Sequence, residues 1–391
     1  MKRTLLLLPF ALFLAILPFP GTVAARLLLL AICFGIALWQ WLRHPETRAP
    51  IPCKAVIGVW LAVCLASLAY AFDAGYSAGE LKNELGYTMM AFFAFFAAGA
   101  DRADLRKLLW ALAIGLVVIG TLGTVAWADN HFFWNETGRH GGSGVVGSLI
   151  VTAAPALAWL ALAERARPPR YLAFAVLVFA LFLAFITMQR AVWPALAIEI
   201  GLAVALAVRT GVTRVSSRRL GIAVAVVVAI AVGGLLHSQQ ARYGNTTDER
   251  VQLTTDSRLA LWPEVAARIA ENPLAGAGFG RAALRKAMPD LIPADTPALW
   301  HAHNVILNYG LSMGVPGMLA LVGLFGGFGV FFWRGSSGTV TAAGIAGVAI
   351  VAGVLLRNQF NDFFVRDMSL LFWALVGLFA RQVVAARQGR T

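Results

Sequence analysis

Long apolar blocks constrain this chain more than any other feature of its sequence. Residues 105–127 and 220–236 are long enough to cross about 30 Å of hydrocarbon as helices. They are apolar on every side, whereas the strands of a membrane barrel alternate apolar and polar residues. A content of 59% hydrophobic and 13% charged residues is also unlike that of a soluble protein. The sequence therefore predicts an all-α polytopic membrane protein.

Apolar blocks of this kind recur along the whole chain. We predict about twelve spans, near residues 4–19, 26–42, 54–72, 85–100, 105–127, 144–163, 171–188, 191–208, 220–236, 305–333, 339–356 and 367–385. Residues 1–25 also resemble a signal peptide, and we interpret them as a retained first span. The predicted organisation is nine spans in 1–236, a long loop region at 237–304 and three spans in 305–391.

The positions of lysine and arginine predict the orientation, because cations near span ends are retained in the cytoplasm. With the N-terminus inside, the cytoplasmic loops hold Arg43, Arg48, Lys54, Arg102, Arg106, Lys107, Arg165, Arg167, Arg170, Arg209, Arg214, Arg218, Arg219 and Arg334. We expect both termini in the cytoplasm and the loop 237–303 in the periplasm. The net charge of +13 is then a topology signal and does not indicate a nucleic-acid partner.

The loop 237–303 carries helix signals of its own. Ser257 is a candidate N-cap, and Leu261, Trp262, Val265 and Ile269 follow at helical spacing. Asn272-Pro273 should end this helix, and the glycine-rich segment 276–280 should form a bend. No strand precedes that segment, so we do not interpret it as a nucleotide-binding loop.

Arginines gather on the predicted outer side, where guanidinium groups can bind phosphate oxygens in a planar fork. Arg190 lies where one apolar run ends and the next begins, and Arg258 starts the predicted loop helix, so we select both as binders of an anion. Arg281 and Arg285 are supporting candidates. The alternative for each arginine is a solvated or headgroup-facing position, or a salt bridge to a nearby acid.

The segment Trp300-His301-Ala302-His303-Asn304 supplies the candidate base. A neutral imidazole can take a proton from a hydroxyl nucleophile, and neighbouring arginines favour the neutral form. No third metal-ligating residue stands near this pair, and no D-x-D motif occurs outside, so we predict no metal and no cofactor. Glu199 lies within a span, where we expect it to pair with a buried arginine or to support the site.

Two stretches of this region resemble the O-antigen ligase and polymerase superfamily. They are SRLALWPEVAARIAENPLAGAGFGR and WHAHNVILNYGLSMGVPG, which contain S-R-x-x-x-W, N-P-x-x-G-x-G and an H-N pair opening a helix with G-x-x-G. The resemblance covers about 60 residues, and the layout of twelve spans with one large periplasmic loop also fits.

The resemblance implies a GT-C-like membrane glycosyltransferase that is multi-pass in the bacterial inner membrane. It implies undecaprenyl-diphosphate-linked O-antigen as donor, and lipid A-core oligosaccharide as acceptor if the chain is a ligase. By position in the motifs, His303 would activate the acceptor hydroxyl, and Arg258 and Arg190 would hold the diphosphate. Asn304 completes the H-N pair. His301 lies outside the family pattern and leaves open which imidazole is the base.

Other functions remain as alternatives at this stage. An O-antigen polymerase would extend the same lipid-linked repeats, and a protein O-oligosaccharyltransferase would use a protein acceptor. A transporter of the lipid-linked glycan would carry ionisable residues near the midplane of several spans, whereas Glu199 is essentially alone there. We therefore expect an enzyme acting at the periplasmic face with membrane lipids around it.

Overall fold

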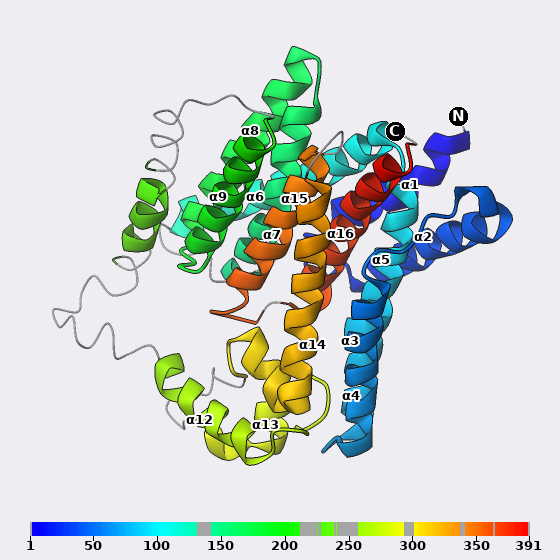
Figure 1. Cartoon of the computed structure of the whole chain (residues 1–391). Coiled ribbons are helices and arrows are strands. Elements are labelled where there is room, and N and C mark those ends of the chain that lie inside the picture. Colours follow the sequence, from blue (N-terminus) through cyan, green and yellow to red (C-terminus); the bar gives the residue numbers. More distant parts are fainter. Residues whose placement is uncertain are drawn as a thin grey trace.

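The computed structural model of the chain describes residues 2–130, 142–211, 225, 228–237, 240, 257–292, 301–336, 341–362 and 364–389. The regular elements in these ranges are all helices, as predicted (Figure 1). Seven are long and apolar enough to cross a membrane: Val23–Arg43 (α2), Arg102–Asn130 (α6), Ser143–Ala163 (α7), Arg167–Ile186 (α8), Val192–Arg209 (α9), Val305–Gly335 (α14) and Arg366–Arg387 (α16). The protein is a helical polytopic membrane protein.

Shorter helices cover the remaining predicted spans. They are Lys2–Ile16 (α1), Lys54–Ala66 (α3), Tyr87–Ala98 (α5), Val228–His237 and Thr341–Arg357 (α15). The helix Ala74–Glu80 (α4) runs into α5 through a π-helical turn at Leu81–Gly86 (η3). Length and composition thus support seven spans, and the first part of the predicted span 220–236 lies largely outside the described residues.

The helix α16 forms the centre of the bundle, and its apolar stretch is entirely buried. It packs closely on α5 because small residues let the two backbones approach. A Cβ atom on Gly377 would lie 2.7 Å from the carbonyl oxygen of Phe92, and one on Gly99 would lie 2.8 Å from that of Leu378. Glycine is therefore required at both positions of this contact.

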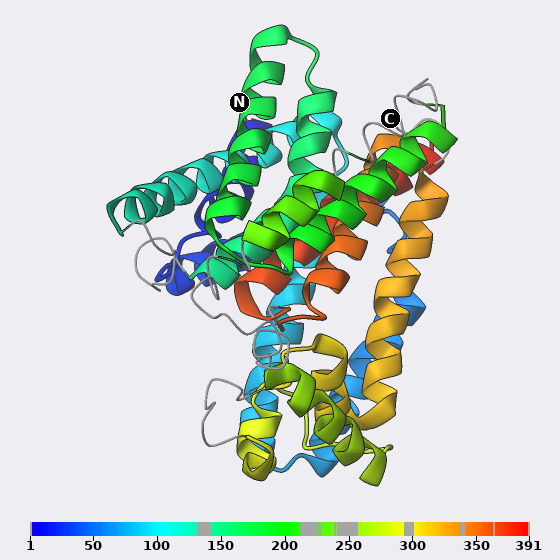
Figure 2. The same ribbon diagram turned by 90° about the vertical axis from the view of Figure 1, so that its left-hand side faces the viewer.

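A small helical lobe stands at one end of the bundle, away from both chain termini (Figure 2). It contains Ser257–Glu271 (α12), Ala283–Ala287 (α13) and Pro289–Leu291 (η4). The predicted helix signals are confirmed, because Leu261, Val265 and Ile269 are buried in a separate apolar cluster and α12 ends one residue before Asn272-Pro273. The N-cap bond predicted for Ser257 lies outside the described side chains.

The glycine-rich segment 276–280 forms the predicted bend between α12 and α13. Gly278 and Gly280 have positive φ angles of 95° and 143°, which side chains other than glycine rarely allow. The backbone N–H groups of Ala277 and Gly278 donate to the carbonyl oxygens of Leu311 and Ser312, each at 2.9 Å. The bend therefore attaches the helical lobe to α14.

The predicted span 305–333 corresponds to α14, which one non-helical residue divides into two helical arms. Gly314 has φ 66° and ψ −164°, which is not helical and interrupts the helix at that residue. A Cβ atom there would lie 2.5 Å from the carbonyl oxygen of Pro273. The arm before Gly314 packs on both parts of the molecule, since Val305 and Met313 are buried in the main core and Leu311 in the cluster of the helical lobe.

Candidate functional site

His303 lies directly before α14 in a left-handed backbone conformation, with φ 51°. Its Nδ1 is 3.0 Å from Oδ1 of Asn361, in the loop between α15 and α16. An amide oxygen only accepts hydrogen bonds, so Nδ1 carries the ring proton and Nε2 holds the lone pair. Asn361 thereby sets the tautomer in which His303 can accept a proton at Nε2.

His301 is only 2% exposed, and its ring stacks on that of His303 with the centroids 3.8 Å apart. Two donors face it: the backbone N–H of His303 lies 3.0 Å from Nδ1, and Nη2 of Arg281 lies 2.8 Å from Nε2. A neutral imidazole has one acceptor nitrogen and can accept from one of these donors, whereas an imidazolium has an N–H on both nitrogens and could accept from neither. Burial and then the charge of Arg281 lower the pKa of His301 well below its ordinary value. His301 is therefore held neutral and is a poor proton acceptor.

Two asparagines of α14 attach this segment to the loop between α15 and α16, residues 358–365. Asn304 caps α14, because its Oδ1 accepts from the N–H groups of Ile306 and Leu307 at 2.9 and 3.1 Å. Its Nδ2 donates to the carbonyl oxygen of Gln359 at 3.1 Å. Asn308 accepts from the N–H of Ala302 and donates to Asp362. Asn304, a supporting candidate from the sequence, thus caps α14 and bonds to the loop 358–365.

Arg258 joins the same loop from α12. Its Nη1 donates to the carbonyl oxygen of Phe360 at 2.6 Å, next to the residue that binds His303. Its charge also contributes to the lowered pKa of His301. The structure therefore brings Arg258, His301 and His303 together, as the sequence predicted for the two ends of the loop.

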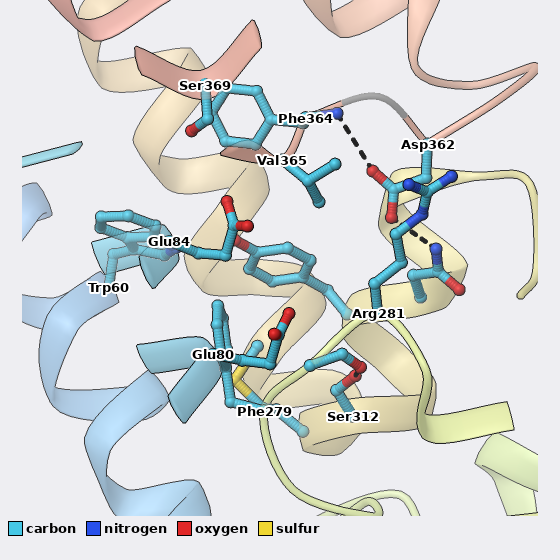
Figure 3. Close-up of a pocket in the computed structure, with 14 residues that line it drawn as sticks. Trp60, Glu80, Glu84, Phe279, Arg281, Ser312, Asp362, Phe364, Val365 and Ser369 are labelled. Atoms are coloured by element: carbon cyan, nitrogen blue, oxygen red, sulfur yellow. Dashed lines mark hydrogen bonds between the residues drawn. The ribbon is translucent and has the colours of Figure 1, made fainter. Parts of the chain in front are cut away.

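Behind the histidines, Arg281 enters a buried polar pocket (Figure 3). Its guanidinium lies beside the carboxylate of Asp362, which also accepts from the N–H of Phe364. Glu84, on η3, accepts from the N–H of Arg366 at 2.7 Å, and Glu80 lies below it. Burial lowers the pKa of Arg281, and the charges of Asp362 and Glu84 oppose that shift. The cavity has a volume of about 30 Å³, enough for about one or two water molecules.

Arg190 lies half-buried in the turn between α8 and α9. The adjacent Gln189 donates to Oγ of Ser143 at 3.0 Å, at the start of α7. Arg357, which is 1% exposed, donates to the carbonyl oxygen of Gly144 at 3.3 Å. Gln189, beside Arg190, and Arg357, at the end of α15, therefore both bond to the first turn of α7.

Two further candidates lie elsewhere. Arg285 is on the exposed face of α13. Glu199 is buried in α9 against Gly353 of α15, where a Cβ atom on the glycine would overlap its carboxylate. Neither carboxylate oxygen of Glu199 has a hydrogen-bond partner among the described residues. The expected pairing of Glu199 with a buried arginine is therefore wrong. Its carboxyl group instead lies against the backbone of Gly353, where α9 and α15 pack closely.

Sequence reasoning missed the contribution of the loop between α15 and α16. Hydrogen bonds connect this region to α7, α12, α14 and the segment that holds the two histidines. They come from the run Arg357-Asn358-Gln359-Phe360-Asn361-Asp362. A dense polar run between two apolar spans was the available signal. In the described part of the chain, no three metal-ligating side chains come together.

One known family is similar to part of this chain. Residues 175–322 match the family model described as O-antigen ligase, which includes α12, both histidines and the start of α14. This part of the chain is therefore similar to the O-antigen ligase family. No curated protein sequence matches the chain significantly.

Proposed function

We propose that the protein is an O-antigen ligase, a metal-independent glycosyltransferase that moves O-antigen polysaccharide from undecaprenyl diphosphate to lipid A-core oligosaccharide. The observation that carries the proposal is that His303 and Arg258, both within the region that matches the family, bond to the adjacent loop residues Asn361 and Phe360. A base next to a guanidinium suits a hydroxyl nucleophile and a diphosphate leaving group.

In the proposed reaction, the acceptor hydroxyl attacks the anomeric carbon of the donor sugar. The new C–O bond forms while the bond from that carbon to the diphosphate oxygen breaks, and the diphosphate leaves with the electron pair. Nε2 of His303 takes the hydroxyl proton, and the Nδ1–H bond to Asn361 supports the imidazolium that results. A single displacement inverts the anomeric centre.

Arg258 and Arg190 are the proposed cations for the diphosphate. A diphosphate is a weak base, so it needs charge stabilisation more than protonation. The bond from Arg258 to the carbonyl oxygen of Phe360 fixes the orientation of its planar guanidinium group. His301 acts as a neutral spacer that orients His303, and Arg281 holds His301 in place.

The number of spans and their orientation in the membrane are part of the same proposal. Twelve spans in a GT-C-like arrangement would put both termini in the cytoplasm, and the helical lobe and His303 on the periplasmic side of the inner membrane. Both termini lie at the end of the bundle opposite the helical lobe, which supports this arrangement (Figures 1 and 2).

Reconstitution in liposomes tests the function directly. Purified protein is supplied with lipid-linked glycan, with or without lipid A-core, and with or without a chelator, and the products are sized. We expect glycan on lipid A-core whether or not the chelator is present. Longer lipid-linked chains without core would identify a polymerase, transfer to protein would identify a protein O-oligosaccharyltransferase, and loss of transfer on chelation would refute the metal-independent mechanism.

A further inference from the structure

A second cavity lies at the end of the bundle opposite the helical lobe, near both chain termini. It has a volume of about 460 Å³ and lies between α1, α2, α5 and the segment that joins α2 to α3. Its boundary also includes Asp104 at the start of α6 and Arg381 near the end of α16. None of these residues belongs to the site around His303.

One wall of this cavity is apolar and belongs to membrane-crossing helices. Phe10 of α1, Ile36 of α2 and Phe93 of α5 line it. The helix α2 is little covered by the rest of the protein, since only 22% of its span is buried. A crevice between helices that is apolar and open at bilayer depth is filled by lipid chains, because unfilled space forfeits dispersion contacts.

The polar end of the cavity carries cations on aromatic rings. The guanidinium of Arg48 lies 4.2 Å from the ring centroid of Trp41, and its Nε donates to the carbonyl oxygen of Trp41 at 2.8 Å. Arg381 is 7% exposed, lies 5.6 Å over the ring of Phe96, and donates through Nη2 to the carbonyl oxygen of Thr47 at 3.1 Å. These contacts hold two guanidinium groups at the mouth of an apolar crevice.

The balance of charge around the cavity favours an anion. Its lining contains one carboxylate, that of Asp104, which binds Nζ of Lys107 at 3.0 Å. The lining also contains Arg48, Arg381 and His44, whose Nδ1 lies 3.1 Å from the carboxylate of Glu46 beside the cavity. Trp39 and Trp41, which are 51% and 39% exposed, are typical of the level where headgroups meet hydrocarbon.

We propose that this cavity binds one anionic phospholipid, with its phosphate at Arg48 and Arg381 and an acyl chain along Phe10, Ile36 and Phe93. Basic pockets between helices on the cytoplasmic side suit anionic headgroups, and the predicted topology puts this end of the bundle there. A zwitterionic lipid would fill the apolar wall equally well but would bring no net charge to the two arginines. The proposal does not depend on the activity at His303.

The test uses the full-length protein in nanodiscs of phosphatidylcholine with increasing phosphatidylglycerol. Native mass spectrometry after release into detergent counts the retained lipids, and the thermal unfolding midpoint is followed in parallel. We expect one retained phosphatidylglycerol and a rise in the unfolding midpoint. Arg48→Gln should weaken this binding about fivefold, because one arginine near a headgroup contributes a factor of about that size.

Arg43→Gln is the matched control. Arg43 is an exposed arginine at the end of α2, at the same end of the bundle, but it does not line the cavity. Equal loss in the two variants would mean general surface attraction and would overturn the site. Retention of phosphatidylcholine as readily as phosphatidylglycerol would overturn its selectivity, and a second protein copy in place of the lipid would show that the crevice is a dimer interface.

Discussion

The two ends of the bundle both hold arginines beside ring systems, but they differ in what those arginines are bound to. At the helical lobe, Arg258 bonds to the carbonyl oxygen of Phe360, and Arg281 bonds to His301 and lines a pocket of about 30 Å³. At the other end, Arg48 and Arg381 border a crevice of about 460 Å³. A small, hydrogen-bonded site orients particular atoms, whereas a roomy apolar site accepts a flexible chain. Proposed chemistry and proposed lipid binding are therefore separated along the bundle.

Removal of the base should have the largest effect at the helical lobe. His303→Ala should lower the rate of glycan transfer by about 100- to 10,000-fold, the usual range for loss of a general base. The measurement is transfer to lipid A-core in liposomes. Membrane insertion and the unfolding midpoint should stay close to wild type, because His303 is only partly buried. A variant that retains most of its transfer rate would refute the role of His303.

The tautomer of His303 can be tested through Asn361, which we regard as a positioning residue. Asn361→Leu removes the acceptor for Nδ1–H and should lower the transfer rate by about 10- to 100-fold, as loss of such orienting bonds does elsewhere. Asn361→Asp keeps an acceptor and should restore transfer. It should also shift the lower limb of the pH profile upwards, since a carboxylate raises the pKa of a bound imidazole. Equal damage from both variants would point to a purely structural role.

The proposed diphosphate contact can be tested on one helix. Arg258→Lys keeps the charge but loses the planar fork, so transfer should fall by about tenfold. Arg268→Lys is the matched control, because Arg268 is also on α12 but pairs with Asp290 at 2.6 Å on the exposed side. Wild-type rates in Arg258→Lys would show that the charge alone is sufficient, and an equal fall in both variants would indicate damage to α12.

Some of the features behind these predictions could be predicted from the sequence, and others could not. The periodicity of Leu261, Val265 and Ile269 predicted α12 and its buried face, and the ends of the loop predicted that Arg258 and His303 come together. Helical periodicity contains no information about which loop pairs with which across the bundle, so the bond between His303 and Asn361, 58 residues apart, was not predictable. The interruption at Gly314 was equally hidden, because glycine also occurs inside membrane helices.

The smallest predicted effect concerns His301 and stability. The unfolded imidazole, with an ordinary pKa of 6.5, takes up a proton below that pH, whereas the folded one, with its pKa lowered by burial, does not. The free energy of unfolding of the helical lobe should therefore fall as pH drops below about 6.5, by at most about 1.4 kcal/mol per pH unit. Hydrogen exchange of residues 257–292 at pH 7.5 and 5.5 measures this. His301→Gln should remove this contribution and leave the opposite one of Glu84, whose pKa burial raises to about 8, whereas His44→Gln, at the exposed opposite end, should leave both unchanged. A wild-type lobe equally stable at both pH values would mean that His301 is not held neutral, and would reopen the choice between the two histidines as the base.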